Sequence, residues 1–244
     1  DLESKINNNT KGIIINSPSN PTGGVWSDDA VLRLLDLVKN RPDIWIFSDE
    51  CYEQLTYDTP FKSIATFNPE AKNIITFQSC SKTYAMTGWR IGYLAGNEKL
   101  VKAISKLQGQ STSCPNSIAQ YAAVEALSGN QNCVNEMREV FHQRRDLILK
   151  ELDCIPGISC EKPNGAFYVF PNFKNYLNSK SSNGSIIKTS SDLSLYILDS
   201  TGVVTVAGDS FGAPYNIRLS YATSDENIIQ ACKLINRALS ELKN

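Results

Sequence analysis

The sequence has little of what two common kinds of catalytic site require. It contains one histidine, His142, which lies in a helical pattern with no partner at metal-ligand spacing, so neither a zinc site nor a histidine-based triad is expected. The seven cysteines are scattered without the spacing of metal ligands or of a disulfide framework. We therefore predict reduced thiols, no bound metal and an intracellular protein.

The sequence also lacks an excess of charge of either sign and any long apolar run. Lysine and arginine together number 24 and aspartate and glutamate 25, which gives a formal net charge of −1. This balance does not favour binding to nucleic acid or to an anionic membrane surface. No run approaches the roughly 20 apolar residues of a membrane span. We expect a cytoplasmic protein, although an organellar targeting peptide would lie before Asp1 and stays open.

The first part of the chain alternates between two patterns. Short apolar, β-branched runs predict buried strands, and segments with apolar residues on one helical face predict helices between them. Ser27 is a suitable N-cap for the first helix. The expected strands are 12–16, 44–47, 73–77 and 91–96, and the expected helices are 26–40, 97–108 and 116–129. Such alternation is typical of a mostly parallel α/β sheet.

The character of the sequence changes near residue 130. A long amphipathic helix is expected at about 130–153, and a last helix is expected to begin with a capping box of Thr223 and Glu226 and to end near Leu242. The expected strands are 165–171, 201–207 and 216–222, and segment 177–192 is expected to be a polar, mobile surface loop.

We interpret this change as a boundary between two domains. Residues 1–140 would form the C-terminal part of a large α/β domain. Residues 141–244 would form a smaller α+β domain, joined to the first by the long helix.

Polar side chains follow three of the expected strands. In open α/β sheets, ligands bind beyond the carboxyl ends of the strands, so these side chains could converge on one small molecule. Each alone has a simpler explanation, as a turn residue or a solvated side chain, and it is their joint order that favours a shared site. The residues are Asn20, Asp49, Tyr52, Ser79, Ser81 and Lys82.

The chemistry of this set fits pyridoxal 5'-phosphate (PLP). The Lys82 amine can form a Schiff base with an aldehyde. A pyridine nitrogen that stays protonated needs a carboxylate beside it, which Asp49 can supply. The hydroxyls of Ser79 and Ser81 and the guanidinium of Arg90 suit a phosphate.

Five segments carry a resemblance to a known family. They are "NSPSNPTGGVW", "SDECYEQLTYD", "SCSKTYAMTGWRIGYLAG", "KPNGAFYVFPN" and "NIRLSYATSDENI". In this order they resemble the fold-type I PLP-dependent aminotransferases of class I/II, and "QGQSTSCPNSIAQYAAVEAL" resembles the aspartate/prephenate aminotransferase branch. The resemblance covers nearly the whole chain. It implies a three-layer αβα large domain, incomplete here, and a smaller α+β domain.

The resemblance implies a role for each matching residue. Lys82 would hold PLP and later act as the general base, and Asp49 would keep the ring nitrogen protonated. Tyr52 and Asn20 would bond the ring oxygen. Arg218 would bind the substrate α-carboxylate. The phosphate would be bound by Ser79 and Arg90, with Ser81 as a weaker candidate.

The resemblance also implies partners. The substrates would be an α-amino acid, expected to be aspartate, and a 2-oxo acid, expected to be 2-oxoglutarate. The full-length protein would be a homodimer.

The sequence departs from the family pattern in three places. The Asn-Pro-Thr-Gly turn begins at residue 20, so we expect about the first third of a typical member to be absent, and we expect these 244 residues alone to bind PLP poorly and not to turn over. Cys51 replaces an aliphatic residue packed on the ring, for which a thiol is a small apolar substitute. Asn164 stands where this branch commonly has glutamate, and nothing in the sequence explains its effect.

Other functions use the same residues. A β- or γ-eliminating lyase or a cyclopropane-forming synthase would need the same lysine, aspartate and arginine. An aminotransferase-like regulatory module is a further alternative, although no DNA-binding stretch is visible. A catalytically inactive homologue is disfavoured because Lys82, Asp49, Tyr52 and Arg218 are all present.

Overall fold

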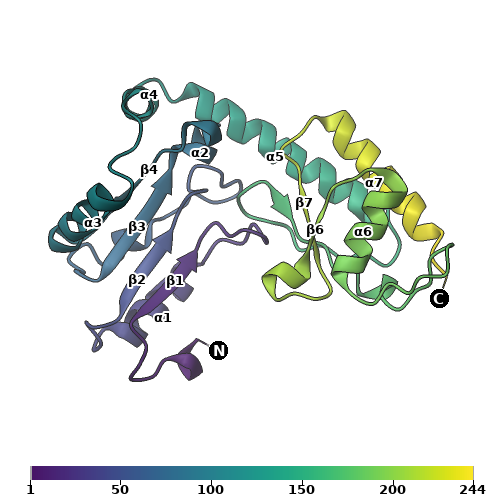
Figure 1. Ribbon diagram of the computed structural model, residues 1–244, viewed down its shortest axis with the longest axis horizontal. Coiled ribbons are helices and arrows are strands. Elements are labelled where there is room, and N and C mark those ends of the chain that lie inside the picture. The colour runs from purple at the N-terminus through teal and green to yellow at the C-terminus, as the bar shows by residue number, and fades with distance from the viewer. Residues whose placement is uncertain (1, 244) are drawn as a thin grey trace. The chain divides into compact units, whose positions relative to one another are not determined.

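The computed structural model describes residues 2–243, which form two compact units. The first unit holds residues 2–19 and 24–138, and the second holds 20–23 and residues from 139 onward. The short segment Asn20–Gly23 therefore belongs by its contacts to the second unit, although it lies between two stretches of the first. Figure 1 labels the elements, and each unit is described by itself.

The first unit is built on a four-stranded sheet in the order β1-β2-β3-β4. The strands are β1 (Gly12–Asn16), β2 (Trp45–Asp49), β3 (Ile74–Ser79) and β4 (Gly92–Ala95). The first three run parallel, with Asn16 opposite Asp49 and Asp49 opposite Phe77, and β4 pairs antiparallel to β3. The predicted, mostly parallel sheet is thus confirmed.

The helices of the first unit follow the predicted pattern. They are α1 (Asp28–Val38), α2 (Cys80–Thr83), α3 (Glu98–Ser111) and α4 (Ser117–Ser128), with short 3-10 helices at Glu3–Lys5, Ile64–Thr66 and Thr87–Trp89. Ser27 caps α1, as expected, by accepting a hydrogen bond from the backbone of Ala30 at 3.2 Å. The four-residue α2 was not predicted.

The core of the first unit lies between α1 and one face of the sheet. Val31 and Leu34 of α1 pack in one cluster with Ile13, Ile15 and other apolar residues of the strands. Because side chains alternate across a strand, Ile14 points to the opposite face, where it is 79% exposed.

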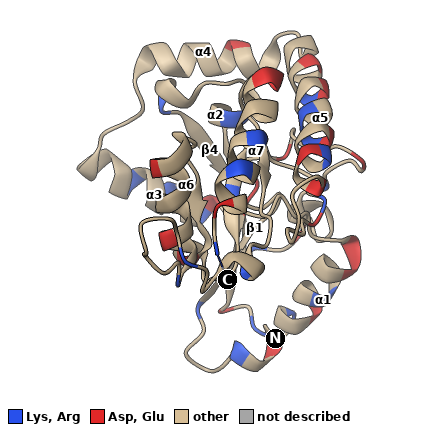
Figure 2. Ribbon diagram, turned by 90° about the vertical axis from the view of Figure 1, so that its right-hand side faces the viewer, with Lys and Arg blue, Asp and Glu red and all other residues tan. Residues whose placement is uncertain are grey.

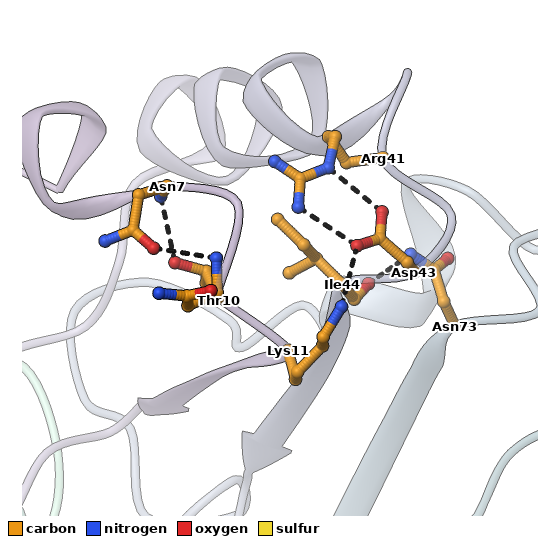
Figure 3. Close-up of polar contacts among 8 residues, drawn as sticks. Asn7, Thr10, Lys11, Arg41, Asp43, Ile44 and Asn73 are labelled. Carbon is orange, nitrogen blue, oxygen red and sulfur yellow. Dashed lines mark hydrogen bonds and ion pairs between the residues drawn. The ribbon is translucent and has the colours of Figure 1, made fainter.

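A purely structural polar cluster stands at the amino ends of the parallel strands (Figure 3). Arg41 bonds both carboxylate oxygens of Asp43, at 2.9 and 3.0 Å, and Lys11 lies 3.5 Å from the same carboxylate. The Asn73 amide donates to the carbonyl oxygen of Ile44 at 2.7 Å. These contacts fix the starts of β1, β2 and β3, so polar groups at the other ends are available for a ligand.

The second unit packs helices against a three-stranded sheet in the order β5-β7-β6. Its elements are the end of α5 (Asn132–Asp153), β5 (Tyr168–Val169), α6 (Ser190–Thr201), β6 (Val206–Ala207), β7 (Ile217–Ser220) and α7 (Asp225–Ser240), with 3-10 helices at Lys174–Tyr176 and Gly208–Phe211. Both pairings of β7 are antiparallel. Its core joins apolar residues from α5, α6, α7 and the sheet.

The prediction for this unit missed one helix and misplaced the start of another. Helix α6 was missed, although Thr189 and Asp192 form a capping box at its start. The last helix has no Thr223–Glu226 box, because Ser224 is its N-cap and accepts from the Asn227 backbone at 3.3 Å.

The expected loop at 177–192 is in part anchored rather than wholly on the surface. Ser179 and Ile187 are buried, and two backbone hydrogen bonds join Lys180 to Lys243.

The two strands predicted at 165–171 and 201–207 are shorter than expected, with two residues each.

Charged residues of both signs are interspersed along the helices. Figure 2 shows acidic and basic residues alternating along α5, in keeping with the near-zero net charge. Within residues 2–243, none of the helices combines the length and the apolar character needed to span a membrane.

We predict opposite effects for two glycine-to-alanine changes. A Cβ on buried Gly208 would lie 2.1 Å from the carbonyl oxygen of Ala213 and 2.3 Å from that of Asn216, so Gly208→Ala should lower the free energy of unfolding by about 1–3 kcal/mol. Gly109 lies in α3 with open space around it, and Gly109→Ala should raise it by roughly 0.5–1 kcal/mol. Urea denaturation of both variants measures the difference, and equal effects would contradict this account of Gly208.

Candidate active site

The turn after β2 places two predicted site residues close together. Asp49 ends the strand, and its Oδ1 accepts a hydrogen bond from the Cys51 backbone at 3.1 Å. The Asp49 carbonyl oxygen accepts from the Ser17 backbone at 3.1 Å and from the Asn16 amide at 3.2 Å, which ties the turn to the end of β1. Tyr52 follows with its side chain buried.

The turn after β3 presents the lysine. Ser79 ends the strand and caps α2, because its hydroxyl accepts from the Ser81 backbone at 3.0 Å. The same hydroxyl donates to the carbonyl oxygen of Ile91 at 3.3 Å. Lys82 lies in α2, and its Nζ is 5.9 Å from the centroid of the Tyr52 ring. The ends of two adjacent strands thus bring Lys82 and Tyr52 together.

The pKa of the Cys51 thiol depends on both Asp49 and Lys82. Burial is the largest cause that raises the pKa of the Cys51 thiol, and the Asp49 carboxylate raises it further. The Lys82 ammonium acts in the opposite direction on the same pKa. The thiol is therefore within electrostatic range of both the Asp49 carboxylate and the Lys82 ammonium.

Arg90 is the least constrained member of the set. It adopts a left-handed conformation (φ 54°), its side chain is exposed, and its Nη1 donates to the carbonyl oxygen of Thr87 at 2.9 Å. It directly precedes Ile91, whose carbonyl oxygen accepts a hydrogen bond from the Ser79 hydroxyl.

Packing explains only one of the two glycines that flank Arg90. A Cβ on Gly92 would lie 2.8 Å from the carbonyl oxygen of Gln78, so β3 requires a glycine there. Gly88 has open space around it, and packing does not explain it.

Glu50 is a buried residue that sequence reasoning missed. Its Oε1 accepts hydrogen bonds from the hydroxyls of Ser48 and Ser63, both at 2.9 Å, and from the Ile64 backbone at 3.3 Å. Burial is the main cause that raises the pKa of its carboxyl, and the two serine hydrogen bonds oppose it. Glu50 ties the Asp49–Tyr52 turn to the core. A glutamate directly after a strand was the available signal.

Two further predicted residues meet in the second unit. Arg218 lies on β7, the central strand, and its Nη1 donates to Asn20 Oδ1 at 2.7 Å. Its guanidinium carbon lies 4.4 Å from the centroid of the Tyr168 ring and 5.5 Å from that of Phe211. Its Nε is buried and has no hydrogen-bond partner among the described residues.

This arrangement can bind a carboxylate. The aromatic rings hold the guanidinium plane, Asn20 occupies one donor, and the buried Nε leaves a donor for a planar anion. A buried, unpaired donor is costly unless a ligand completes it.

The donor set of the first unit fits PLP. It offers an amine for an aldehyde, a carboxylate for a ring nitrogen, a phenol, two serine hydroxyls and a nearby guanidinium. These groups come from Asp49, Tyr52, Ser79, Ser81, Lys82 and Arg90.

Comparison with known proteins agrees with this geometry. The family described as "Aminotransferase class I and II" matches residues 1–235. The chain belongs to this family. The aspartate/prephenate aminotransferase of Cereibacter sphaeroides is 43% identical over 96% of this chain and 59% of its own length.

Solved structures agree with the sequence relatives. The aspartate aminotransferase of Rhizobium meliloti is 40% identical and matches 99% of this chain and 61% of its own with a TM-score of 0.95. An aromatic aminotransferase of Pyrococcus horikoshii is 35% identical and matches 98% of this chain and 62% of its own with a TM-score of 0.89. The mixed α/β fold is thus that of the aminotransferases, and the chain spans about 60% of the length of these relatives.

We predict that Glu50 makes stability depend on pH in a known direction. Because its folded-state pKa is raised, the stability that it contributes is complete below the unfolded value of about 4.3 and is lost as pH rises through the raised pKa. Glu50→Gln cannot ionise. The free energy of unfolding of Glu50→Gln should therefore increase relative to that of the wild type as pH rises from about 4 to 8. Urea denaturation at each pH measures this difference. Parallel pH profiles would show that Glu50 has an ordinary pKa.

We also predict that cysteine labelling follows burial. Cys114, Cys133 and Cys154 are exposed and should react with iodoacetamide at neutral pH. Cys51 should react more slowly because burial and Asp49 raise the pKa of its thiol. In the full-length protein, PLP should slow the reaction of Cys51 further, and alkylation of Cys51 should hinder PLP binding. Peptide mass mapping measures the rates, and labelling of Cys51 that PLP leaves unchanged would argue against its predicted place at the ring.

Proposed function

We propose that the complete protein is a PLP-dependent aminotransferase that moves an amino group between an α-amino acid and a 2-oxo acid. The observation that carries the proposal is that Asp49, Tyr52 and Lys82 gather at the ends of two adjacent strands. Family membership supports the same reaction type. Residues 1–140 would be part of the PLP-binding large domain and 141–244 the small domain.

The residues of the first unit would hold the cofactor and move the proton. When bound, PLP supplies an electrophilic aldehyde and a ring that accepts electrons. Lys82 would hold PLP through its amine, and the same amine would be the base that accepts the proton from the substrate α-carbon. The Asp49 carboxylate would hold a proton on the ring nitrogen, while the backbone N–H of Cys51 donates to its Oδ1 and fixes its orientation.

The remaining groups would position the cofactor. The Tyr52 phenol and the Asn20 amide would bond the ring oxygen. Ser79 and Arg90, with Ser81, would bind the phosphate through hydroxyls and a guanidinium.

The second unit would bind the substrate. Arg218 would take the α-carboxylate, with Asn20 holding one edge of the guanidinium and Tyr168 its face. Aspartate and 2-oxoglutarate are the proposed substrates, and the names of the Cereibacter and Rhizobium relatives support aspartate. The full-length protein is proposed to be a homodimer.

We predict that Lys82→Ala lowers the transamination rate of the full-length protein by about 10³-fold or more, because both the cofactor attachment and the proton acceptor are lost. Lys72→Ala is the matched control, since Lys72 is exposed just before the opposite end of β3. The assay pairs aspartate with a panel of 2-oxo acids and measures both products. Ammonia released without an acceptor would instead identify a lyase, and full activity of Lys82→Ala would refute the assignment.

We also predict that these 244 residues alone bind PLP weakly and do not turn over. The relatives that they match are longer, and α4 exposes Ile118, Tyr121 and Val124. Titration with PLP followed by absorbance, beside the full-length protein, measures this. Tight binding with full transaminase activity by the 244 residues would refute it.

A further inference from the structure

Arg145 is a buried arginine that the proposed reaction does not use. It lies on α5 with its side chain 0% exposed. Its Nε and Nη2 lie 2.9 and 2.8 Å from Asp146 Oδ1, and its Nη1 donates to the carbonyl oxygen of Pro163 at 3.3 Å. A buried guanidinium carries a desolvation cost, so a fold that keeps one needs the contacts that it makes.

The backbone that Arg145 holds is pressed against the Asn20–Gly23 turn. The Gly23 carbonyl oxygen accepts from the backbones of Asn164 at 3.0 Å and Gly165 at 2.8 Å. A Cβ on Gly23, which has a φ of +66°, would lie 2.4 Å from Pro163 Cβ. The two segments are in close contact, so a displacement of Pro163 would also displace Gly23.

Of the three groups that contact the Arg218 guanidinium, Asn20 and Tyr168 belong to these segments, and Phe211 does not. Asn20, whose Oδ1 is 2.7 Å from Arg218 Nη1, opens the turn that ends at Gly23. Tyr168, whose ring lies 4.4 Å from the guanidinium, follows Gly165 by three residues. A Cβ on Gly23 would also lie 3.3 Å from the Tyr168 carbonyl oxygen, so the turn and this strand are in close contact.

We propose that Arg145 is a positioning residue for the carboxylate site, acting through Pro163 and the Asn20–Gly23 turn on Arg218. The inference rests on the proposed function, because it takes Arg218 as the carboxylate ligand. Arg145 does not touch the substrate; it sets where the Asn20 amide and the Tyr168 ring hold the guanidinium. Loss of this support lets the guanidinium leave the orientation that a bidentate pair needs.

The test uses the full-length, PLP-loaded protein and maleate, a dicarboxylate that cannot be transaminated. Arg145→Met should raise the Kd of maleate and the KM of the amino acid by about tenfold, the equivalent of one hydrogen bond, with the affinity for PLP unchanged. Arg145→Lys keeps one donor and should show a smaller rise. Leu152→Ala is the matched control, because Leu152 is fully buried on the same helix and lies in the core cluster instead.

The outcomes separate positioning from general stability. An unchanged maleate Kd in folded Arg145→Met, or an equal rise in Leu152→Ala at the same loss of melting temperature, overturns the proposal. If Arg145→Met does not fold, Asp146→Asn is the second test. Asp146 is half-exposed, and the change removes the negative charge that orients the Arg145 guanidinium. A maleate Kd that rises in this variant supports the proposal, and an unchanged one overturns it. Wild-type protein that neither transaminates nor binds maleate would refute the proposed function instead.

Discussion

The parallel pairing of β2 with β3 is the constraint on which the candidate site depends. Parallel strands end at the same edge of a sheet, so the register that sets Asp49 opposite Phe77 also sets the turn after Asp49 beside the turn after Ser79. The carboxylate and the amine come from residues 33 positions apart in sequence, and no local structure could join them. A slip of one residue in this register would turn Asp49 to the other face.

The two ends of this sheet carry polar groups for different purposes. At the amino ends, Arg41, Asp43 and Lys11 satisfy one another and hold the strands in place. At the carboxyl ends, the polar side chains accept hydrogen bonds from nearby backbone N–H groups, as Asp49 does from Cys51 and Ser79 does from Ser81. Buried Glu50 ties the turn after β2 to the core through its hydrogen bonds to Ser63 and Ile64.

The second unit holds Arg218 between an aromatic ring and an amide, as the proposed carboxylate site requires. Arg218 has a ring on its face and an amide at one edge, while its Nε remains unpaired among the described residues. The amide arrives from a distant part of the sequence, because the Asn20–Gly23 turn packs with the second unit. Gly23 permits this, since any side chain there would meet Pro163.

The sequence predicts the repeating features well and the long-range ones poorly. The strand at 12–16 and the helix after Ser27 follow from periodicity and capping and are confirmed. Helix α6 was missed because its capping box lies in a serine-rich run that was interpreted as a surface loop. The importance of Arg145 could not be predicted, because its partner Pro163 is a neighbour only after folding. The position of Glu50 directly after a strand was a signal, but its partner Ser63 is likewise a neighbour only after folding. The roles of the site residues were assigned from the family motif, and they stay predictions.

The central claim is that the Lys82 amine is the attachment point of the cofactor beside Asp49. The most direct test is to treat the PLP-loaded, full-length protein with borohydride, which makes the lysine linkage permanent, and to map the modified peptide by mass spectrometry. The account predicts that the modification lies on Lys82 in the segment that follows β3. Modification of another lysine, or of none at saturating PLP, would contradict it.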